Sequence, residues 1–318
     1  MQTENSDAFD ELDCGDDARA YYKEKLDAYR DQINRHHSNE RWRTYPFMAT
    51  VETLARCNAA CEFCPYPTLE RKGTEMSAQL FEKIIDDLAD ADPRGPTLFT
   101  LSRVNEPFLD KRIFDFAALV ETKFPKICQM HFTNASPLNR RNFDEFLKLK
   151  RTTLLKISFN DHRKDEYERV MQIPFERTLS NVREIHARKE AGEFAFPVRI
   201  GRVGDGTKAD SEFLAWAKRE FPLFDAHVSP RFDWRGKIRN PNWSVPDVGC
   251  LQWLELHILA NGTDAFCCTD SEGEFGVGDA ARNHVVHDIY NHPDRRKLRE
   301  AMPSRRSVAG CATCSALA

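Results

Sequence analysis

Residues 56–67 read RCNAACEFCPYP, and this stretch governs how the rest of the chain is interpreted. It holds Cys57, Cys61 and Cys64 in the spacing Cys-x3-Cys-x2-Cys, with no fourth cysteine nearby. Three thiolates on one short loop can hold three irons of a [4Fe-4S] cube, because cysteine thiolates are the usual ligands of such clusters. One iron would then be open to an outside ligand. A zinc knuckle, or chance clustering of the cysteines, is the alternative.

Composition narrows the class of protein. The chain has 318 residues, 41% hydrophobic and 30% charged, which suits one large domain plus a smaller one. A formal charge of only -4 does not mark a nucleic-acid binder. No apolar run approaches the roughly 18 residues of a membrane span, and the polar start MQTENSDAFDELD is not that of a signal peptide. We expect a cytoplasmic protein without nucleic-acid or membrane partners.

Cysteine usage points to metal. Ten cysteines in an intracellular chain favour metal binding over disulfides. Eight of them fall in two clusters, one in residues 56–67 and the other near the C-terminus. Cys14 and Cys128 stand alone and are expected to be ordinary thiols.

Residues 1–45 are predicted to form a helical arm. Tyr22, Leu26, Tyr29 and Ile33 recur at helical intervals in a highly charged segment. We expect this helix to pack on the surface of the main domain. A domain that recognises a precursor peptide would need roughly twice this length plus several strands. The arm therefore argues against a peptide substrate.

From residue 47 onward the pattern alternates between strands and helices. Apolar, β-branched segments predict strands at 47–54, 97–102, 127–133, 153–159, 196–203 and 224–230. Helical periodicity lies between them at 77–91, 110–124, 140–149, 175–192 and 211–221. Six consecutive βα units imply an α/β fold with a parallel sheet.

The cysteine spacing, with Phe63 just before the last cysteine, resembles that of the radical S-adenosylmethionine (SAM) enzymes. In that family the open iron chelates the amino and carboxylate groups of SAM, which is cleaved to a 5′-deoxyadenosyl radical. The resemblance implies a partial (β/α)6 barrel over residues 46–233. In parallel barrels the active site lies at the C-terminal ends of the strands.

The second predicted strand ends in RVNEP, residues 103–107, which is similar to the Gly-Gly-Glu-Pro motif of the family. That motif binds the amino group of SAM. Val104 and Asn105 replace both glycines, while Glu106 matches the acid. A carboxylate here can accept a charge-assisted hydrogen bond from the ammonium. A turn with a solvated glutamate is the alternative.

Further SAM contacts are expected at later strand ends. Asn134 stands at the position where the family often has a Thr-Asn-Gly turn. A guanidinium on the fifth strand can bind the SAM carboxylate through two hydrogen bonds. Polar strand-end residues paired with backbone, or core packing of the tyrosine, are the alternatives. The proposed contacts are Asn134, Ser158, Asn160, Arg199, Arg202 and, near the adenine, Tyr66.

A smaller domain is predicted over residues 234–318. Asn261-Gly262 fits the turn of a β-hairpin that brings Cys250 and Cys267 together. This segment resembles the SPASM and twitch extensions of radical SAM enzymes, which carry an auxiliary [4Fe-4S] cluster and a helix between their ligands. The resemblance implies two [4Fe-4S] clusters in the chain. A zinc ribbon is the alternative, since spacing does not separate zinc from iron. The auxiliary ligands assigned are Cys250, Cys267, Cys311 and Cys314.

Cys268 has no assigned iron. Adjacent residues on a strand point to opposite faces, so Cys268 can face away from the ligand Cys267. Its thiol is a candidate hydrogen-atom donor to a carbon radical. A small buried hydrophobe, or an exchange of ligand roles with Cys267, is the alternative.

The motifs favour a radical enzyme acting on a small polar molecule, such as an aminosugar, aminocyclitol or aminoglycoside of antibiotic biosynthesis. Hydrogen abstraction at a carbinol carbon would lead to an epimer if Cys268 quenches the radical. It would lead to a ketone if the auxiliary cluster accepts an electron, which defines a dehydrogenase. A peptide or protein maturase is a further alternative. An iron–sulfur protein without catalysis and a zinc interaction module fit less well. An external electron donor of the flavodoxin or ferredoxin type is expected.

Overall fold

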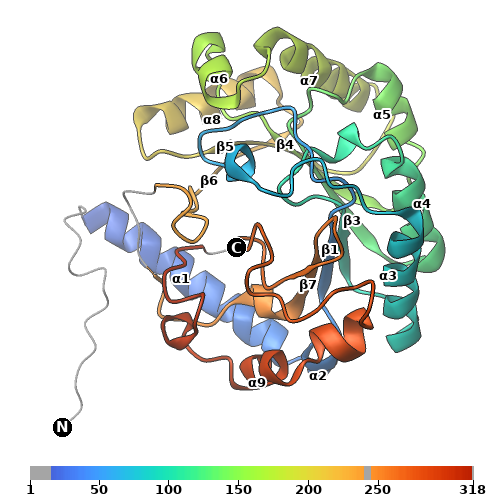
Figure 1. Ribbon diagram of the computed structural model, residues 1–318. Coiled ribbons are helices and arrows are strands. Elements are labelled where there is room, and N and C mark those ends of the chain that lie inside the picture. The colour runs from blue at the N-terminus through green and yellow to red at the C-terminus, as the bar shows by residue number, and fades with distance from the viewer. Residues whose placement is uncertain (1–15, 240–244, 317–318) are drawn as a thin grey trace.

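A computed structural model describes residues 16–239 and 245–316, with side chains from Leu26 onward. Its centre is a curved sheet that carries helices along its outer side (Figure 1). Cys14 lies outside the described residues, and the side chain of Tyr22 is likewise not described. None of the described helices is both long enough and apolar enough to cross a membrane.

The six predicted strands are present and pair in parallel in chain order. They are β1 (Met48–Val51), β2 (Leu98–Thr100), β3 (Cys128–Thr133), β4 (Thr152–Ser158), β5 (Val198–Val203) and β6 (Asp225–Ser229). The sheet order is β6-β5-β4-β3-β2-β1-β7-β8, so two C-terminal strands extend the edge beyond β1. The α/β fold with a partial, parallel barrel is confirmed.

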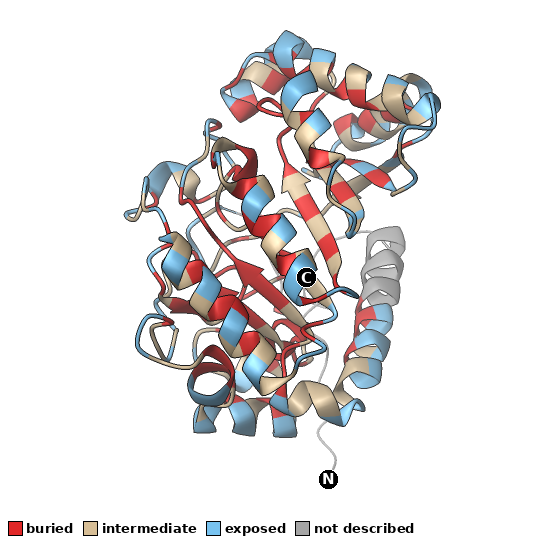
Figure 2. Ribbon diagram, turned by 90° about the vertical axis from the view of Figure 1, so that its right-hand side faces the viewer, coloured by how far each residue is buried: buried red, intermediate tan, exposed pale blue. Residues whose placement is uncertain are grey.

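Alternation along each strand separates an outer from an inner face. Val198 and Ile200 of β5 are buried in the main hydrophobic core, while Arg199 between them is exposed. Leu155 and Ile157 of β4 lie in the same core. Figure 2 shows the matching pattern on the helices, which bury the side facing the sheet and expose the opposite side. The core therefore lies between sheet and helices, and polar side chains are left for the inner face.

The outer layer contains one helix that the sequence pattern did not predict. After β4 a single helix was expected, but a short helix precedes it. This short helix ends at Met171 and is followed by Gln172 in the left-handed conformation with φ 57°. Its length of 8 residues is too short to show a periodic signal. The helices of this layer are α3 (Ala78–Ala91), α4 (Ile113–Lys123), α5 (Arg140–Phe146), α6 (Lys164–Met171), α7 (Phe175–Glu190) and α8 (Lys208–Glu220).

The C-terminal segment is joined to the barrel through its hairpin. Strand β7 (Glu255–Ile258) pairs in parallel with β1 and antiparallel with β8 (Asp264–Ala265). Gly262 sits at the turn with φ +86°, a conformation that glycine adopts without strain. The remaining elements are the short helices η3 (Leu251–Leu254), η4 (Val285–Tyr290, a π-helix) and η5 (Arg305–Ser307), and α9 (Pro293–Ala301).

The N-terminal helices pack on this C-terminal segment. Tyr29 and Ile33 of α1 (Asp16–His37) form a buried cluster with Leu251 and Leu254 of η3. The short helix α2 (Glu40–Thr44) lies against α9, as Figure 1 also shows. The predicted helix is present, but within the described residues its buried face meets the C-terminal segment rather than the outer helices of the barrel.

Candidate active site and auxiliary cluster site

The first candidate site is the loop after β1 that carries Cys57, Cys61 and Cys64. All three thiols are free and half-buried. The backbone N–H of Ala59 lies 3.4 Å from the Cys57 sulfur, and the N–H of Cys64 donates to the carbonyl of Cys61 at 3.1 Å, which closes a turn. The loop therefore curls back on itself at the C-terminal end of the barrel strands.

The electrostatics of these thiols fit a bound cation. Burial raises the pKa of Cys57 to about 12 and the pKa of Cys64 to about 11. Burial also raises the pKa of Cys61, and the neighbouring Cys64 and Cys57 raise it further. Three thiolates this close together and desolvated need positive charge to be stable, and a coordinating metal deprotonates a thiol outright. The three residues would hold a cluster, with none of the other described cysteines beside them.

Glu106 lies buried between this loop and the end of β3, with 1% of its surface exposed. Its carboxylate accepts from the Thr133 hydroxyl at 2.8 Å and from the Asn134 N–H at 2.6 Å. Burial is the largest influence and raises the pKa of Glu106 to about 7, despite these hydrogen bonds. A carboxylate held this way is strongly stabilised by an added cation, so it remains our candidate for the SAM ammonium.

The two residues that replace the glycines have structural roles. Asn105 accepts the N–H of Arg103 through its side chain at 2.7 Å, which forms the turn that glycines would otherwise allow. Val104 is buried against Ala55 and Ala260. The departure from the family pattern therefore preserves a turn that delivers Glu106 to the site.

We expect Glu106→Gln to weaken SAM binding by roughly 1.5–3 kcal/mol, the usual contribution of a hydrogen bond to a charged group. A glutamine nitrogen cannot accept the hydrogen bonds that Glu106 accepts now. Because the unliganded carboxyl has a pKa of about 7, wild-type affinity should fall as the pH drops below 7, when the carboxyl gains a proton. Affinity of the variant should not follow pH in this window.

Equilibrium binding of SAM to anaerobically reconstituted protein measures both effects. Glu176→Gln is the matched control, since that side chain is 68% exposed on α7. Unchanged affinity in the Glu106 variant, with wild-type iron content, would show that the SAM ammonium lies elsewhere.

Asn134 and Asn160 lie at successive strand ends but have different surroundings. Asn134 donates to the side chain of Asn58 at 3.0 Å, and its nitrogen is 4.0 Å from the Cys57 sulfur. Asn160, with φ 70°, accepts the N–H of Val203 at 2.9 Å and holds β4 to β5. Ser158 lies on the inner face of β4, half-buried. Asn134 is therefore beside the cysteine loop, and Asn160 is engaged in joining strands.

The two arginines of β5 point to opposite faces. Arg199 lies on the inner face and pairs with Asp225 at 2.8 Å. Arg202 is 6% exposed and donates to Asp161 at 2.7 Å, to Asp205 at 2.6 Å and to Asp210 at 2.8 Å. These carboxylates occupy the guanidinium of Arg202, which leaves it unavailable to a SAM carboxylate. We assign it the role of holding the loops after β4 and β5 together.

Tyr66 begins the short helix η1 (Tyr66–Thr68), directly after the cysteine loop. It is half-buried against the cluster of Ala55 and Leu69, and the Lys72 ammonium lies 5.6 Å from its ring centroid. The ring is thus next to the cysteine loop, where an adenine contact remains a proposal.

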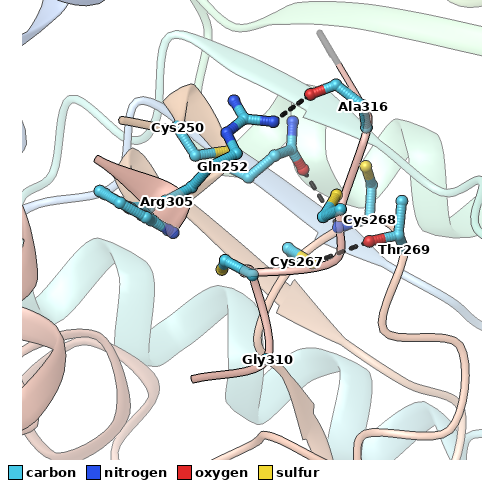
Figure 3. Close-up of a pocket in the computed structure, with 11 residues that line it drawn as sticks. Cys250, Gln252, Cys267, Cys268, Thr269, Arg305, Gly310 and Ala316 are labelled. Carbon is cyan, nitrogen blue, oxygen red and sulfur yellow. Dashed lines mark hydrogen bonds between the residues drawn. The ribbon is translucent and has the colours of Figure 1, made fainter. Parts of the chain in front are cut away.

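The second candidate site is a pocket that all five C-terminal cysteines line (Figure 3). Cys250 precedes η3, Cys267 and Cys268 follow β8, and the other two return on the last loop. Burial raises the pKa of Cys250 to about 11 and of Cys311 to about 12. Cys267 raises the pKa of Cys250, Cys311 and Cys314, which shows that the sulfurs converge. The residues fit a cluster with cysteine ligands.

Cys268 differs from its neighbours in what surrounds it. Its backbone N–H donates to the side-chain oxygen of Gln252 at 3.1 Å. The amide nitrogen of Gln252 in turn donates to Glu255 at 3.1 Å. Cys267, by contrast, lies 3.3 Å from the Thr269 hydroxyl. Cys268 therefore adjoins a polar group from β7, the strand that continues the barrel sheet.

Arg103 is a site residue that the sequence analysis missed. Its guanidinium lies 3.0 Å from Nδ1 of His257 and donates to the carbonyls of Cys267 at 3.1 Å and Asp270 at 3.0 Å. It thereby connects the end of β2 with the auxiliary cysteines. A lone arginine before Val104 gives no local signal for this, because its partners are more than 150 residues away in sequence.

Helix α1 also contributes to the auxiliary site. The hydroxyl of Tyr29 donates to the Cys250 sulfur at 3.6 Å and accepts the N–H of Leu251 at 3.1 Å. Arg305, 1% exposed, donates to the carbonyl of Gly249 at 2.8 Å and to the Tyr29 hydroxyl at 3.2 Å. The helical arm is thus tied to the first auxiliary cysteine.

We expect Tyr29→Phe to lower the midpoint potential of the auxiliary cluster. A hydrogen bond to a ligand sulfur stabilises the reduced, more negative cluster, so its loss makes reduction harder. A redox titration followed by electron paramagnetic resonance measures the shift. Tyr45→Phe is the control, because that buried hydroxyl donates to the carbonyl of Leu88, away from the cysteines. Equal potentials in wild type and Tyr29→Phe would contradict the contact.

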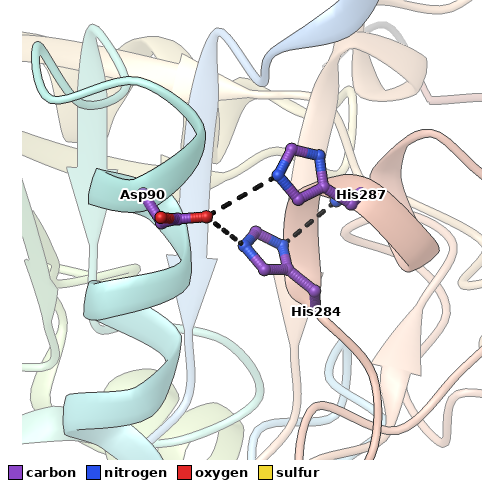
Figure 4. A group of neighbouring side chains, drawn as sticks. All are labelled: Asp90, His284 and His287. Atoms are coloured by element: carbon purple, nitrogen blue, oxygen red, sulfur yellow. Dashed lines mark hydrogen bonds and ion pairs between the residues drawn. The ribbon is translucent and has the colours of Figure 1, made fainter.

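A third group of possible ligands lies on the surface, where Asp90 of α3 approaches His284 and His287 (Figure 4). Nδ1 of His284 accepts the backbone N–H groups of Val286 at 3.2 Å and His287 at 3.1 Å, which caps η4. A neutral ring that accepts at Nδ1 carries its proton on Nε2. That nitrogen, 3.5 Å from Asp90, then faces the carboxylate as a donor and offers no lone pair to a metal. The group is best explained as a helix cap that lies beside a carboxylate.

Comparisons with known proteins agree with this geometry. The Radical SAM superfamily model matches residues 51–196, and a model described as an iron-sulfur cluster-binding domain (SPASM) matches residues 250–315. No curated protein matches the sequence. The chain therefore carries a radical SAM domain followed by a SPASM domain towards its C-terminal end. Its cofactors are SAM and [4Fe-4S] clusters, including an auxiliary cluster in the SPASM domain, and such enzymes require a reductant.

Three solved structures share the fold. BtrN in complex with AdoMet and 2-DOIA has a TM-score of 0.59 at 16% identity, over 85% of this chain and 93% of that chain. Streptococcus suis SuiB bound to precursor peptide SuiA has a TM-score of 0.64 at 14% identity, over 86% of this chain and 70% of that chain. The protein anSMEcpe with bound AdoMet and Cp18Cys peptide has a TM-score of 0.58 at 12% identity, over 84% of this chain and 87% of that chain. At these identities the likeness concerns the fold alone.

Proposed function

We propose that this radical SAM enzyme epimerises a carbinol carbon of a small polar substrate, such as an aminosugar, aminocyclitol or aminoglycoside. The observation that carries the proposal is a fifth cysteine, Cys268, in a pocket where four thiolates suffice for a cluster. With its cofactors bound, the barrel site supplies a 5′-deoxyadenosyl radical, which removes the carbinol hydrogen. Cys57, Cys61 and Cys64 would hold the cluster, and Glu106 would orient SAM through its ammonium.

The outcome then depends on which group reaches the planar carbon next. Epimerisation requires a hydrogen donor on the face opposite the deoxyadenosine, and a thiol has a weak S–H bond. The transfer forms the new C–H bond and leaves a thiyl radical on the cysteine, which one electron from the required reductant and one proton return to the thiol. Cys268 is linked to Glu255 through Gln252, whose side chain accepts the Cys268 N–H at 3.1 Å and donates to Glu255 at 3.1 Å. Glu255 and His257 alternate with the outward core residues Leu256 and Ile258, which places both on the inner face of β7. This neighbourhood supports Cys268 as the donor.

Dehydrogenation is the second candidate, and Glu255 is the observation in its favour. Oxidation to a ketone requires a base for the hydroxyl proton and an electron acceptor nearby. Glu255 is buried, which raises its pKa to about 8, and it lies 3.3 Å from Nε2 of His257. The ionised form of a carboxyl with a raised pKa is a stronger base, so the carboxylate of Glu255 would accept that proton, and the auxiliary cluster would accept the electron.

The substrate class rests on the likeness to BtrN. That chain was crystallised with AdoMet and 2-DOIA, and the match spans 93% of it. SuiB, crystallised with a precursor peptide, is spanned over only 70% of its length, so part of SuiB has no counterpart in the match. The anSMEcpe chain, solved with a bound peptide, is spanned over 87% of its length, which keeps peptide or protein maturation as the third candidate. We propose a cytoplasmic setting, residues 46–233 as the SAM-binding unit, residues 234–318 as the auxiliary unit, and a flavodoxin or ferredoxin as the electron donor.

Anaerobic reconstitution with SAM and dithionite, followed by mass spectrometry of candidate aminoglycoside precursors, tests the proposal. An epimer leaves the mass unchanged and shifts the retention time. Loss of two hydrogens would identify a dehydrogenase instead. Formation of 5′-deoxyadenosine that responds only to peptides would overturn the substrate class.

A further inference from the structure

The inner face of β4, β5 and β6 carries an excess of positive charge. Lys156 is paired in register with Arg199, and Arg199 with Asp225. The alternating neighbours Leu155, Ile157, Val198 and Ile200 are buried in the core on the outer side, so these three charged side chains face inward. Arg199 and Asp225 form an ion pair at 2.8 Å, which leaves Lys156 as the uncompensated charge.

Lys156 has no carboxylate partner among the described residues. Its ammonium lies 5.8 Å from the ring centroid of Phe132, a neighbour in the register of β3 and β4. Burial, and then the positive charge of Arg199, lower the pKa of Lys156. An ammonium that is half-buried beside another cation is destabilised until an anion reaches it.

His227 completes the group from β6. Neither ring nitrogen has a hydrogen-bond partner in the described structure, although both are buried. The ring lies directly over Gly201, where an added Cβ would stand 2.4 Å from it. Burial, followed by Lys156 and Arg199, lowers the pKa of His227, which favours the neutral ring, and a neutral imidazole has one N–H to donate. The absence of a side chain at Gly201 makes room for this ring on the inner face.

We infer that Lys156, Arg199 and His227 form a subsite that binds an anionic group of the substrate, either a phosphate or a carboxylate. The inference rests on the proposed function and narrows its substrate class to an aminosugar or related polyol that carries such a group. An oxyanion here would accept hydrogen bonds from the ammonium of Lys156 and from the imidazole N–H of His227. Its negative charge would balance that of Lys156, which Asp225 does not neutralise because it pairs with Arg199. A guanidinium that already shares Asp225 can add a charge-assisted hydrogen bond.

The test is the reactivity of Lys156 in the reconstituted holoenzyme. An acetylating reagent modifies free amines, and mass spectrometry of peptides follows each lysine separately. Inorganic phosphate, acetate, glucosamine, glucosamine 6-phosphate and glucuronate are added in turn, each with and without SAM. Lys148 is the internal control, since its side chain is 68% exposed at the end of α5.

We expect anionic probes to slow acetylation of Lys156 severalfold, in the presence of SAM as well as in its absence, and to leave Lys148 unaffected. Stronger protection by inorganic phosphate and glucosamine 6-phosphate assigns a phosphate, and stronger protection by acetate and glucuronate assigns a carboxylate. Protection by neither class overturns the inference. Protection that SAM alone provides, and that anions then fail to increase, also overturns it, because the SAM carboxylate would be the occupant.

Two variants of Lys156 test whether anion binding depends on its positive charge. Lys156→Arg should retain binding of inorganic phosphate measured by calorimetry, while Lys156→Met should lose it. Equal binding in all three proteins would contradict the subsite. Iron content and 5′-deoxyadenosine formation, measured on the same samples, report on the radical SAM function separately from anion binding.

Discussion

Replacing Cys57, Cys61 and Cys64 together by alanine should abolish SAM cleavage and leave about four of about eight irons per chain, because each [4Fe-4S] cluster holds four. The remaining irons belong to the auxiliary cluster in the pocket lined by the C-terminal cysteines. The three thiols share one desolvated loop, whereas the five C-terminal cysteines line a separate pocket. Iron analysis, visible absorption and the yield of 5′-deoxyadenosine measure the result.

Cys128→Ala is the matched control for this experiment. Cys128 is a free, half-buried thiol that opens β3 at the opposite end of the strand from Asn134. Its loss should change neither iron content nor SAM cleavage. Stoichiometric zinc in anaerobically purified protein, without iron–sulfur absorption, would contradict the two-cluster account.

The second large effect is expected at Cys268. Cys268→Ala should keep both clusters and still convert SAM to 5′-deoxyadenosine in the presence of substrate, yet form no epimer. The reason is that the substrate radical would form normally but lack its hydrogen donor. Product analysis by chromatography, together with iron content, measures the two consequences separately. Cys128→Ala is a suitable control, since it removes a free thiol that does not line this pocket.

Other outcomes of this variant are equally informative. Loss of the auxiliary cluster would show that Cys268 is a ligand and would make Cys267 the candidate donor. Normal turnover with loss of two hydrogens from the substrate would exclude the donor role and favour a dehydrogenase with Glu255 as the base.

The sequence predicts the strands and the cysteine loops because both are encoded locally. The β-branched runs define β1 to β6, and the spacing of the cysteines defines their loops. The pairing of β7 with β1 was not predictable, because it joins residues about 200 positions apart through backbone hydrogen bonds that carry no sequence signal. Helix α6 was missed because it is short.

For the site residues, the sequence predicts which face of a strand a side chain lies on, but not which partners it contacts. Alternation along β5 separates Arg199 from Arg202. The partners that occupy Arg202 come from other elements, since Asp161 lies in the loop after β4 and Asp210 in the first turn of α8. Arg103 and Tyr29 reach the auxiliary cysteines through tertiary contacts alone. Lys156 and His227 became candidates once the register showed them on the inner face.

The central claim is that the substrate radical receives a hydrogen atom from a thiol. The most direct measurement is turnover in deuterated water, followed by mass spectrometry and nuclear magnetic resonance of the product. A thiol exchanges with solvent, so we predict one solvent deuterium at the inverted carbon and none elsewhere. A ketone product without solvent deuterium would contradict the claim.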